Sequence, residues 1–530
     1  MPRLMPFVAN LLLVLLLLAA PLPSQGAEPR AADQTLVRVA LFDTSADSVR
    51  ALAEGAATLL TVESLPQPYA LAVADQAGLA WLKDNGYRVE MLDGDAAGAR
   101  YLMVDLAGAL AERERPGVEL YNDGVRAVRR LEPGQAVTLD KGVWLLDQPL
   151  RWVEREPLAL PDSVTPIAQV QQIINQVDLP RLMVYANELS GEVPATIVGQ
   201  PYTIATRFSG DSTYPTPPQA SFMAGSYMIE RLARLGLNVT THTWNASRPP
   251  NVIAEKPGLN PAAAGIVIIC AHLDSTSNNR FNLAPGADDN GSGSVAVLMA
   301  AEILSHYNFD ATLRFILFTG EEQGLLGSAA YAQMVQSQDI RGVLNMDMIA
   351  WDAIDGPDMD IHSRATVPGN TALANLYRDV IRAYELPLTP VVYSNGIGAS
   401  DHASFWNRNI PAILAIENYT ADTGAPRDFN TYYHSINDRT QHFNQGYFHA
   451  MAKASIGTFA HMGSLRTGCY WADLDCSGQV DALDIARAAG FWQTQRGQWN
   501  YSLVYDVDGD GAIGVVDIQR FSAQWGWDGS

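Results

Sequence analysis

Three apolar runs in the middle of the chain each end beside residues that can bind a metal ion or transfer a proton. The runs have the length and composition of buried strands and span residues 265–271, 312–319 and 342–346. The residues that follow them are His272, Glu321, Glu322 and Asp347. Helical patterns alternate with the runs at residues 219–235, 295–304 and 327–335. This alternation indicates a mixed, largely parallel sheet between layers of helices, in which functional groups gather at the carboxyl ends of the strands.

The length of the chain predicts several domains. At roughly 150 residues per domain, 530 residues correspond to three or four units. Apolar residues make up 48% and charged residues 17% of the chain, which is enough for a large core and excludes a disordered polyelectrolyte. Changes in pattern divide the chain into four segments: a signal peptide at 1–27, an α/β pro-region at 28–162, the main α/β domain at 163–466 and a small all-α domain at 469–530.

The N-terminus has the pattern of a secretory signal peptide. Arg3 precedes an apolar stretch over residues 7–20, and Pro21 and small residues follow as far as Ala27. The stretch is shorter than the about 20 apolar residues that a membrane-spanning helix needs. We therefore expect an exported, extracellular protein without membrane insertion. A net charge of −22 would repel phosphate backbones, so we expect no nucleic acid partner.

Two histidines and three carboxylates form a candidate site for two metal ions. Two ions about 3.5–4 Å apart need a bridging carboxylate and further donors on each side. One bridge, with one histidine and one carboxylate for each metal, uses all five candidates: His272, Asp288, Glu322, Asp347 and His434. Imidazole and carboxylate donors without thiolate suit two Zn²⁺ ions best, with manganese and cobalt as alternatives.

Two further carboxylates have expected roles at this site. Glu321 is adjacent to Glu322, cannot easily bind the same ion and is free to act as a general base. Asp274, two residues after His272, can accept the second ring N–H of that histidine. A single His or Asp after a strand is usually a capping or loop residue, and a Glu-Glu pair is usually solvated. The complete set, in this order at strand ends, favours a catalytic site.

Residues 165–465 resemble the secreted bacterial aminopeptidases of the M28 metallopeptidase family. The resemblance rests on four motifs in order: His-Leu-Asp-Ser at 272–275, Pro-Gly-Ala-Asp-Asp-Asn-Gly-Ser-Gly at 285–293, Thr-Gly-Glu-Glu-Gln-Gly-Leu-Leu-Gly-Ser at 319–328 and Asn-Met-Asp-Met at 345–348. It implies the fold shared by zinc peptidases and phosphorylase/hydrolase-like proteins, and a leucyl aminopeptidase activity on peptides that depends on two zinc ions.

The resemblance also implies a role for each site residue. Asp288 would bridge the metals, His272 and Asp347 would hold one zinc, and Glu322 and His434 would hold the other. Glu321 would be the general base, and Asp274 would belong to the catalytic machinery. A cis peptide bond would join Asp288 and Asp289, and Ser400-Asp401-His402 would lie near the site without binding metal.

The residues that flank the ligands predict the substrate pocket. They are apolar or aromatic, and we expect Met348, Phe429 and Tyr433 to line it, although each also fits a role in the core. Without a nearby Lys or Arg partner, such a pocket favours large apolar over acidic N-terminal residues. Alternative functions are an M28-fold glutaminyl cyclase, which keeps one zinc, a carboxypeptidase, and a non-catalytic binding protein displayed through its C-terminal part.

The last 60 residues contain a repeat that resembles a type I dockerin. Residues 473–484 recur 33 residues later at 506–517, and apolar helical patterns at 485–491 and 518–525 follow the two copies. Side-chain oxygens occupy positions 1, 3, 5, 9 and 12 of the first loop and positions 1, 3, 5 and 12 of the second, with Gly478 and Gly511 at the sharp turns. The expected Ca²⁺-binding residues are Asp473, Asp475, Ser477, Gln479, Asp481, Asp484, Asp506, Asp508, Asp510, Ala512 and Asp517.

A cohesin-like docking partner is the corresponding expectation for this module. The residues at positions 10 and 11 are apolar in both loops, which departs from a conventional cohesin contact. The three cysteines cannot form a disulfide framework. Cys469 and Cys476 are close enough for a local disulfide, and Cys270 is expected to be a buried thiol.

Overall fold

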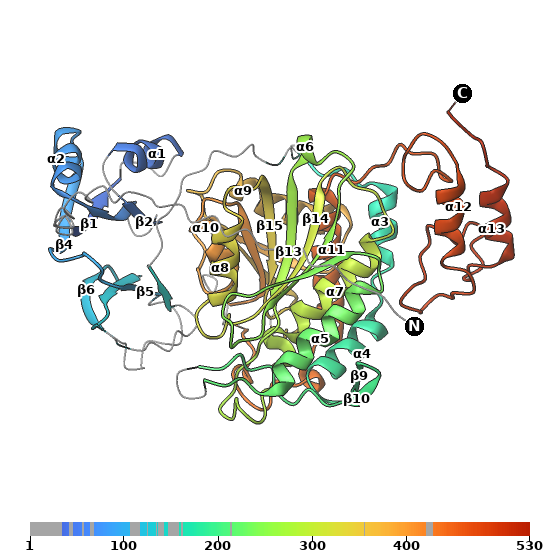
Figure 1. Cartoon of the computed structure of the whole chain (residues 1–530), viewed down its shortest axis with the longest axis horizontal. Helices are drawn as coiled ribbons and strands as arrows, with labels where there is room; N and C mark the ends of the chain where they lie inside the picture. Colours follow the sequence, from blue (N-terminus) through green and yellow to red (C-terminus); the bar gives the residue numbers. More distant parts are fainter. Residues whose placement is uncertain are drawn as a thin grey trace, which may run out of the picture.

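The structure of the chain is a computed structural model with three parts in sequence order (Figure 1). It describes residues 34–41, 46–55, 58–63, 68–105, 117–124, 126–133, 135, 143–146, 158, 160, 163–211, 215–354, 356–419 and 428–529. The expected signal peptide at 1–27 lies outside these residues. A helix with the length and hydropathy needed to cross a bilayer is absent from the described part of the chain.

The central part is built on an eight-stranded mixed sheet, counted in the described residues. In spatial order its strands are β11 (Asn238–His242), β12 (Asn251–Lys256), β14 (Thr312–Phe318), β13 (Ile266–His272), β15 (Ile340–Met346), β18 (Ala412–Glu417), β16 (Asp358–His362) and β17 (Thr389–Tyr393). The four middle strands, β14, β13, β15 and β18, run parallel to one another. The pairs β11–β12, β12–β14 and β16–β18 are antiparallel. The expected mixed, largely parallel sheet is confirmed.

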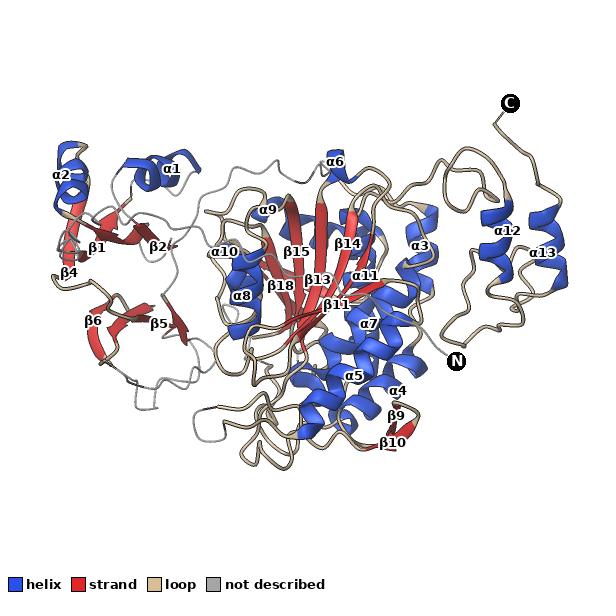
Figure 2. Ribbon diagram, viewed as in Figure 1, coloured by secondary structure: helices blue, strands red, loops and turns tan. Residues whose placement is uncertain are grey.

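Helices cover both faces of this sheet (Figure 2). One face packs against α3 (Ala168–Asn175), α4 (Leu179–Leu189), α5 (Gln219–Ala233), α7 (Gly293–Leu304), α9 (Asn370–Ala383) and α11 (Gln445–Met462). The other packs against α8 (Leu326–Met334) and α10 (His402–Trp406). In β13, Val267 and Ile269 enter the first core, whereas Ile268 and Cys270 enter the second. Strand β13 is therefore buried on both faces, which explains its continuous apolar run. The thiol of Cys270 is free and buried, as expected.

Helix α7 connects the core to the loop that carries the Asp288–Asp289 pair. All its residues are buried, and its sequence is apolar except for Ser294 and Glu302. A helix without a solvent-facing polar side belongs inside a large core, between the sheet and other helices. The turn Ala287–Ser292 leads directly into α7, so the core fixes the end of that loop. The shorter elements of this part are β9 (Ala195–Ile197), β10 (Gln200–Tyr202) and α6 (Pro261–Ala264).

The N-terminal part contains two small antiparallel sheets in its described residues. The first has the order β2 (Thr58–Glu63), β3 (Tyr69–Ala74), β1 (Thr35–Ala40), β4 (Arg88–Asp93), with α1 (Ala46–Gly55) and α2 (Gln76–Asp84). The second has the order β6 (Val118–Asn122), β7 (Arg126–Arg130), β5 (Tyr101–Asp105), β8 (Val143–Leu145). This agrees with the expected α/β segment; its role as a pro-region stays a prediction.

The C-terminal part contains two helices, α12 (Ala482–Ala489) and α13 (Val515–Ser522), and the expected disulfide between Cys469 and Cys476. Both helices begin three residues before their expected starts at 485 and 518. The reason is a capping box at α12, in which Asp481 accepts the N–H of Leu483 and Asp484 accepts the N–H of Asp481. A carboxylate cap satisfies otherwise unpaired N–H groups and starts the helix inside the repeat.

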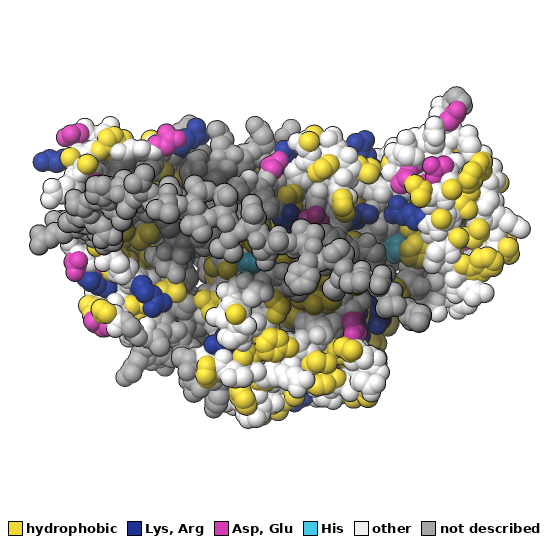
Figure 3. Space-filling model, viewed as in Figure 1, with side chains coloured by type: hydrophobic (Ala, Val, Ile, Leu, Met, Phe, Trp, Pro, Cys, Tyr) yellow, Lys and Arg dark blue, Asp and Glu magenta, His cyan; other side chains and the backbone are white. Residues whose placement is uncertain are grey.

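The C-terminal part packs against the central part. The side-chain amide of Asn308 donates to the carbonyl of Leu474 at 2.8 Å. The ring of His306 packs edge-on against the stacked rings of Phe491 and Tyr505, with centroid distances of 5.0 and 5.5 Å. On the outer surface, apolar side chains gather over this end of the molecule (Figure 3). The exposed large apolar residues of this part are Trp471, Leu483, Trp492, Trp499, Val515, Val516 and Trp525.

Candidate metal centre

Four of the five predicted ligands meet at one edge of the central sheet. His272 is the last residue of β13, Asp347 directly follows β15, and Glu322 lies in the loop after β14. These three strands are parallel neighbours, so their carboxyl ends meet at the same edge. His434 reaches the site from the segment before α11. The strand-end arrangement expected from the sequence is therefore present.

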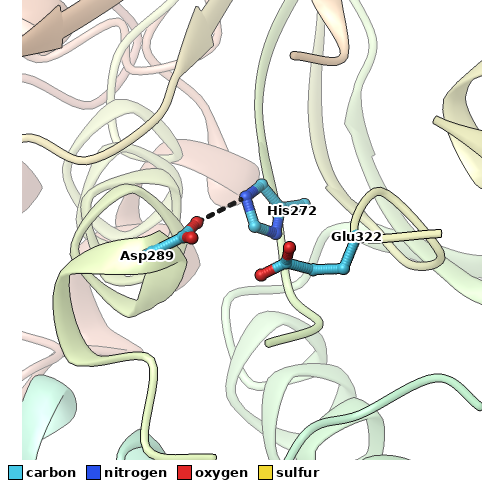
Figure 4. Close-up of side chains that lie close together, drawn as sticks. All are labelled: His272, Asp289 and Glu322. Atoms are coloured by element: carbon cyan, nitrogen blue, oxygen red, sulfur yellow. Dashed lines mark ion pairs between the residues drawn. The ribbon is translucent and has the colours of Figure 1, made fainter. Parts of the chain in front are cut away.

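The ligand atoms form two groups around the same carboxylate. Nε2 of His272 lies 3.3 Å from Oδ1 of Asp347, and Nε2 of His434 lies 3.0 Å from Oε2 of Glu322. Asp289 lies between them, with Oδ1 at 3.2 Å from Nε2 of His272 and Oδ2 at 3.2 Å from Nε2 of His434. Figure 4 shows the carboxylates of Asp289 and Glu322 directed toward the ring of His272. One histidine and one carboxylate on each side of a shared carboxylate is the geometry that a pair of metal ions needs.

The prediction that Asp288 is the bridging residue is wrong, because the structure places Asp289 there. Asp288 points away from the histidines: Oδ1 accepts the main-chain N–H of Ala350 and Oδ2 accepts the amide of Asn430, both at 2.9 Å. The cis peptide bond joins Asp289 to Asn290, one residue later than expected. The path of the backbone through residues 286–292 decides which of two adjacent carboxylates faces the histidines.

The donor atoms fit a metal ion better than they fit each other. Among the described residues, Nε2 of His272, Nε2 of His434 and both carboxylate oxygens of Glu322 are buried without a hydrogen bond of suitable geometry. Ligand atoms of His272, Asp289 and Glu322 lie within 4.8 Å of one another, as do those of His272, Glu321 and Asp347. Buried lone pairs that converge in this way are costly unless a cation occupies the space between them. Nitrogen and oxygen donors without sulfur suit zinc.

The electrostatics of the site favour positive charge. Burial opposes protonation of His434, but the carboxylates of Glu322 and Asp289 outweigh it and raise the pKa of this histidine to about 9. For His272, burial likewise lowers the pKa, and Glu321 and Asp347 shift it well above its ordinary value. The same negative field that would protonate the two rings would attract divalent cations.

Glu321 lies beside one of the two groups and is buried. Its Oε2 atom is 3.9 Å from Nε2 of His272. This is farther than the 3.2–3.3 Å of the carboxylates of Asp289 and Asp347 from the same atom. The carboxylate of Glu321 is therefore close to the position of a metal ion without being its nearest oxygen donor, which suits the expected general base.

Asp274 acts differently from the expectation. Its main-chain carbonyl lies 3.0 Å from Nδ1 of His272, whereas its carboxylate oxygen lies 3.7 Å away. The carbonyl is therefore the partner that orients the ring. The carboxylate of Asp274 accepts the N–H groups of Glu321 and Glu322 at 3.2 and 3.3 Å. Asp274 thus positions the two glutamates, and burial raises its own pKa to about 6.

The Ser400-Asp401-His402 segment is buried near the site and holds no ligand position. Nε2 of His402 lies 2.9 Å from the carbonyl of Ile397, and burial lowers the pKa of this histidine to about 3. The ring is therefore neutral and donates from Nε2. Ser400 accepts the side-chain amide of Asn345, which links the segment to strand β15.

The three expected pocket residues belong to one apolar cluster beside His434. The cluster contains Met348, Ile397, Ala399, Leu414 and Ile416, with Tyr419, Phe429 and Tyr433 packed against it. Met348 is fully buried, and Phe429 and Tyr433 are partly exposed. The rings of Phe429 and Tyr433 meet edge to face at 5.1 Å, and Tyr433 stacks on His434 at 3.7 Å. An apolar surface therefore adjoins the metal centre.

The two C-terminal loops each gather three carboxylates. The groups are Asp473, Asp475 and Asp484 in the first loop, and Asp506, Asp508 and Asp517 in the second. Gly478 and Gly511 have φ values of +89° and +90°, as the sharp turns require. Asp481, expected to be a ligand, instead caps α12, and the hydroxyl of Ser477 donates to the carbonyl of Gln479. Asp510 accepts the N–H of Ala512. Donor sets made only of oxygen suit a hard cation such as Ca²⁺.

Three residues that support the metal centre are not predicted by the sequence pattern: Asp289, Arg207 and Asp438. The Asp-Asp pair was a signal for Asp289 but could not distinguish its two members. Asp438 lies four residues after His434, and its carboxylate accepts the N–H groups of Asp288 and Asp289. The guanidinium of Arg207 donates to four main-chain carbonyls, so no pattern of side-chain types marks it.

Comparison with known proteins connects this centre to one peptidase family. The model of Peptidase family M28 matches residues 251–458, which contain the two histidines and all the carboxylates of the two ligand groups. Aminopeptidase Y of Saccharomyces cerevisiae is 30% identical over 210 residues, which is 37% of this chain and 37% of the yeast protein. A probable leucine aminopeptidase of Arthroderma otae is 33% identical over 208 residues, which is 37% of this chain and 53% of the relative. The chain thus matches about a third to a half of these relatives' lengths.

A solved structure shares the fold. The crystal structure of the Legionella pneumophila LapA aminopeptidase matches with a TM-score of 0.51 at 18% identity, covering 69% of this chain and 98% of that chain. The central part therefore has a fold found in a bacterial aminopeptidase, and its residues 251–458 carry the match to the M28 peptidases.

Proposed function

We propose that the protein is an aminopeptidase that depends on two zinc ions. The observation that carries the proposal is the position of Asp289 between His272 and His434, at 3.2 Å from each ring. The match of residues 251–458 to the M28 model and the names of the relatives support the same activity. His272 and Asp347 would hold one ion, Glu322 and His434 the other, and Asp289 both.

The chain's own residues supply the proton transfer. Two bound metals would activate a water molecule and polarise the scissile carbonyl. Glu321 would accept the proton of that water at its carboxylate and deliver it to the leaving amine. The carboxylate of Asp274 would hold Glu321 in place by accepting the main-chain N–H of Glu321. The carbonyl of Asp274 would keep the ring of His272 oriented.

The apolar cluster beside the metals would accept the first side chain of the substrate. Phe429 and Tyr433 offer partly exposed rings next to His434. Burial of a leucine-sized side chain is worth roughly 1.5–3 kcal/mol. The described residues of this cluster are apolar or aromatic, so an acidic side chain would lose hydration on entering it. The proposed substrates are peptides with a large apolar N-terminal residue.

The remaining segments support proposals about the setting of this activity. Residues 1–27 have the signal-peptide pattern, so we propose that the protein is exported. The oxygen-rich loops of residues 473–484 and 506–517 would bind Ca²⁺. The exposed apolar residues of α12 and α13, Leu483, Val515 and Val516, are where a docking partner of this module would bind.

Metal analysis of the purified full chain, combined with a panel of aminoacyl amides, tests the proposal. We expect about two zinc ions per catalytic unit, loss of hydrolysis after chelation, and recovery when zinc is returned. One zinc per unit together with cyclisation of N-terminal glutamine would replace the aminopeptidase with a glutaminyl cyclase. Release of C-terminal residues would indicate a carboxypeptidase, and metal binding without turnover a binding protein.

A further inference from the structure

The guanidinium of Arg207 is buried in the scaffold of the metal centre. The residue is 1% exposed. Nε donates to the carbonyl of Leu273 at 2.6 Å, and Nη2 donates to the carbonyl of Gly286 at 2.7 Å. Nη1 donates to the carbonyls of Leu189 and Pro285 at 3.0 and 2.5 Å. One planar group therefore ties together three separate segments of the main chain.

Two of these segments carry the metal ligands. Leu273 directly follows His272 at the end of β13, and Pro285 and Gly286 lie four and three residues before Asp289. The approach is close: a Cβ atom added to Gly286 would lie 2.5 Å from Cβ of Ser275 and 3.1 Å from Nη2 of Arg207. The φ of Gly286 is also positive, at +48°. A Cβ at this position would also overlap the carbonyl oxygen of Asp289, so the tight loop beside Arg207 requires glycine at 286.

Asp438 holds the same loop through its N–H groups. Its side chain is 2% exposed, and its two oxygens accept the N–H groups of Asp288 and Asp289 at 3.1 and 3.0 Å. Its own carbonyl accepts the N–H of Ala287 at 3.1 Å. Because Asp438 lies four residues after His434, it joins the bridging aspartate to the segment that carries the second histidine.

Burial of an arginine in this position has an electrostatic cost that the surrounding charges offset. Burial lowers the pKa of Arg207 to about 10, and the carboxylates of Asp438 and Asp274 act in the opposite direction. The guanidinium thus stays charged at neutral pH. A lysine would keep the charge but could not reach four carbonyls, because its ammonium group is a single point and has only three donors.

We propose that Arg207 and Asp438 are positioning residues that clamp residues 285–289 from two sides and so set the carboxylate of Asp289 between His272 and His434. The inference rests on the proposed two-metal centre. It assigns no contact with the substrate to either residue. The arginine holds the carbonyls of the loop, the aspartate holds its N–H groups, and the spacing of the two metal sites follows from both.

The test uses the full chain with Arg207→Lys and Asp438→Asn. Arg314→Lys is the matched control for the arginine, because Arg314 is a hydrogen-bonded side chain of β14 that binds Glu255 and Gln338. Asp428→Asn is the control for the aspartate, because Asp428 accepts the N–H groups of Ala353 and Ile354 outside the ligand cluster. Zinc stoichiometry and affinity are measured by competition with a chromophoric chelator, alongside thermal unfolding.

We expect both clamp variants to weaken zinc binding by about 10–100-fold, the usual scale for groups that orient metal ligands. At saturating zinc, kcat should fall and KM should change little. The controls should lose comparable thermal stability and keep wild-type zinc affinity. Wild-type affinity in the clamp variants, with only a lower Tm, would make Arg207 and Asp438 merely structural and overturn the proposal.

Hydrogen exchange of the zinc-free wild type tests the clamp if a variant does not fold. The N–H groups of Asp288 and Asp289 should be protected before zinc is added, because Asp438 already holds them. Exchange at the rate of an open loop until zinc binds would overturn the proposal. A wild type that binds two zinc ions and hydrolyses no peptide would refute the proposed activity and leave these measurements valid, because none of the affinity readouts needs a substrate.

Discussion

Oδ1 of Asp289 lies 3.2 Å from Nε2 of His272, whereas the carboxylate of its neighbour Asp288 binds the N–H of Ala350 and the amide of Asn430. Substitution of each of the two adjacent aspartates should therefore have a different effect on zinc binding. Asp289→Asn should reduce the zinc content below two per unit and lower turnover by about 10²-fold or more, because the shared charge between the two metals is lost. Asp288→Asn should keep both zinc ions. Metal analysis and kcat of the two variants decide the assignment, and the reverse pattern would restore Asp288 as the bridge.

The difference between these neighbours shows what the sequence could and could not predict at the site. His272, Glu322 and Asp347 follow strands, and parallel strands must bring their ends to one edge, so their convergence was predictable. The choice between Asp288 and Asp289 depends on the backbone dihedrals of a short loop. Residue type alone does not contain that information.

Arg207 was unpredictable for another reason. Its partners are carbonyls of residues 189, 273, 285 and 286, which every residue type possesses. Only the fold brings them together. The early start of α12 was easier to predict from the sequence, because Asp481 followed by Asp484 has the spacing of a capping box. Both aspartates also occupy calcium-ligand positions, so the same two residues fit a loop ligand as well as a helix cap.

Replacement of Glu321 by Gln should leave the fold and zinc content intact while turnover falls by about 10²-fold or more. The amide keeps the size of the side chain but cannot accept the proton. Glu322→Gln is the contrasting variant, because it should lower zinc content as well as turnover. The measurements are kcat and metal content of both proteins. Activity of Glu321→Gln within a few-fold of the wild type would remove Glu321 from the mechanism.

The pocket assignment predicts a ranking of substrates. Leucyl amides should exceed alanyl amides in kcat/KM by about 10–200-fold, and glutamyl and aspartyl amides should be the poorest. Phe429→Ala should reduce the preference for leucine over alanine by about tenfold, because this ring packs between Tyr419 and Tyr433 at 5.3 and 5.1 Å. Faster cleavage of acidic than of leucyl amides would refute the pocket while leaving the metal centre in place.

Calcium should order the two C-terminal loops in the full chain. Without a cation, the carboxylates gathered in each loop repel one another, and the small module has little core to offset that repulsion. Hydrogen exchange should show protection of residues 473–484 and 506–517 in calcium and its loss in chelator. Asp475→Asn should reduce the calcium-dependent protection of the first loop more than that of the second. Asp508→Asn should do the reverse. Equal protection in calcium and in chelator would contradict the calcium assignment.

The contact between the central and C-terminal parts should weaken in acid because of His306. Burial lowers the pKa of this histidine to about 3, and the nearby cations of Arg487, Lys256 and Arg181 act in the same direction. The ring contacts Phe491 and lies 3.4 Å, at Nδ1, from the hydroxyl of Tyr505. The docked state thus requires a neutral ring.

The sign of the pH effect follows from this depressed pKa. When the two parts separate, His306 gains water and its pKa returns toward about 6.5, so the separated state binds more protons between pH 6.5 and 3. Docking is therefore fully stable above pH 6.5 and weakens as the pH falls. At pH 5 the expected loss is roughly 2 kcal/mol, because each pKa unit corresponds to about 1.4 kcal/mol. His306→Gln has no titrating ring and should remove this pH dependence. Hydrogen exchange of residues 487–505 between pH 7 and 4.5 measures the pH dependence of this contact. Identical acid-induced loss of protection in the wild type and in His306→Gln would show that another group controls the contact.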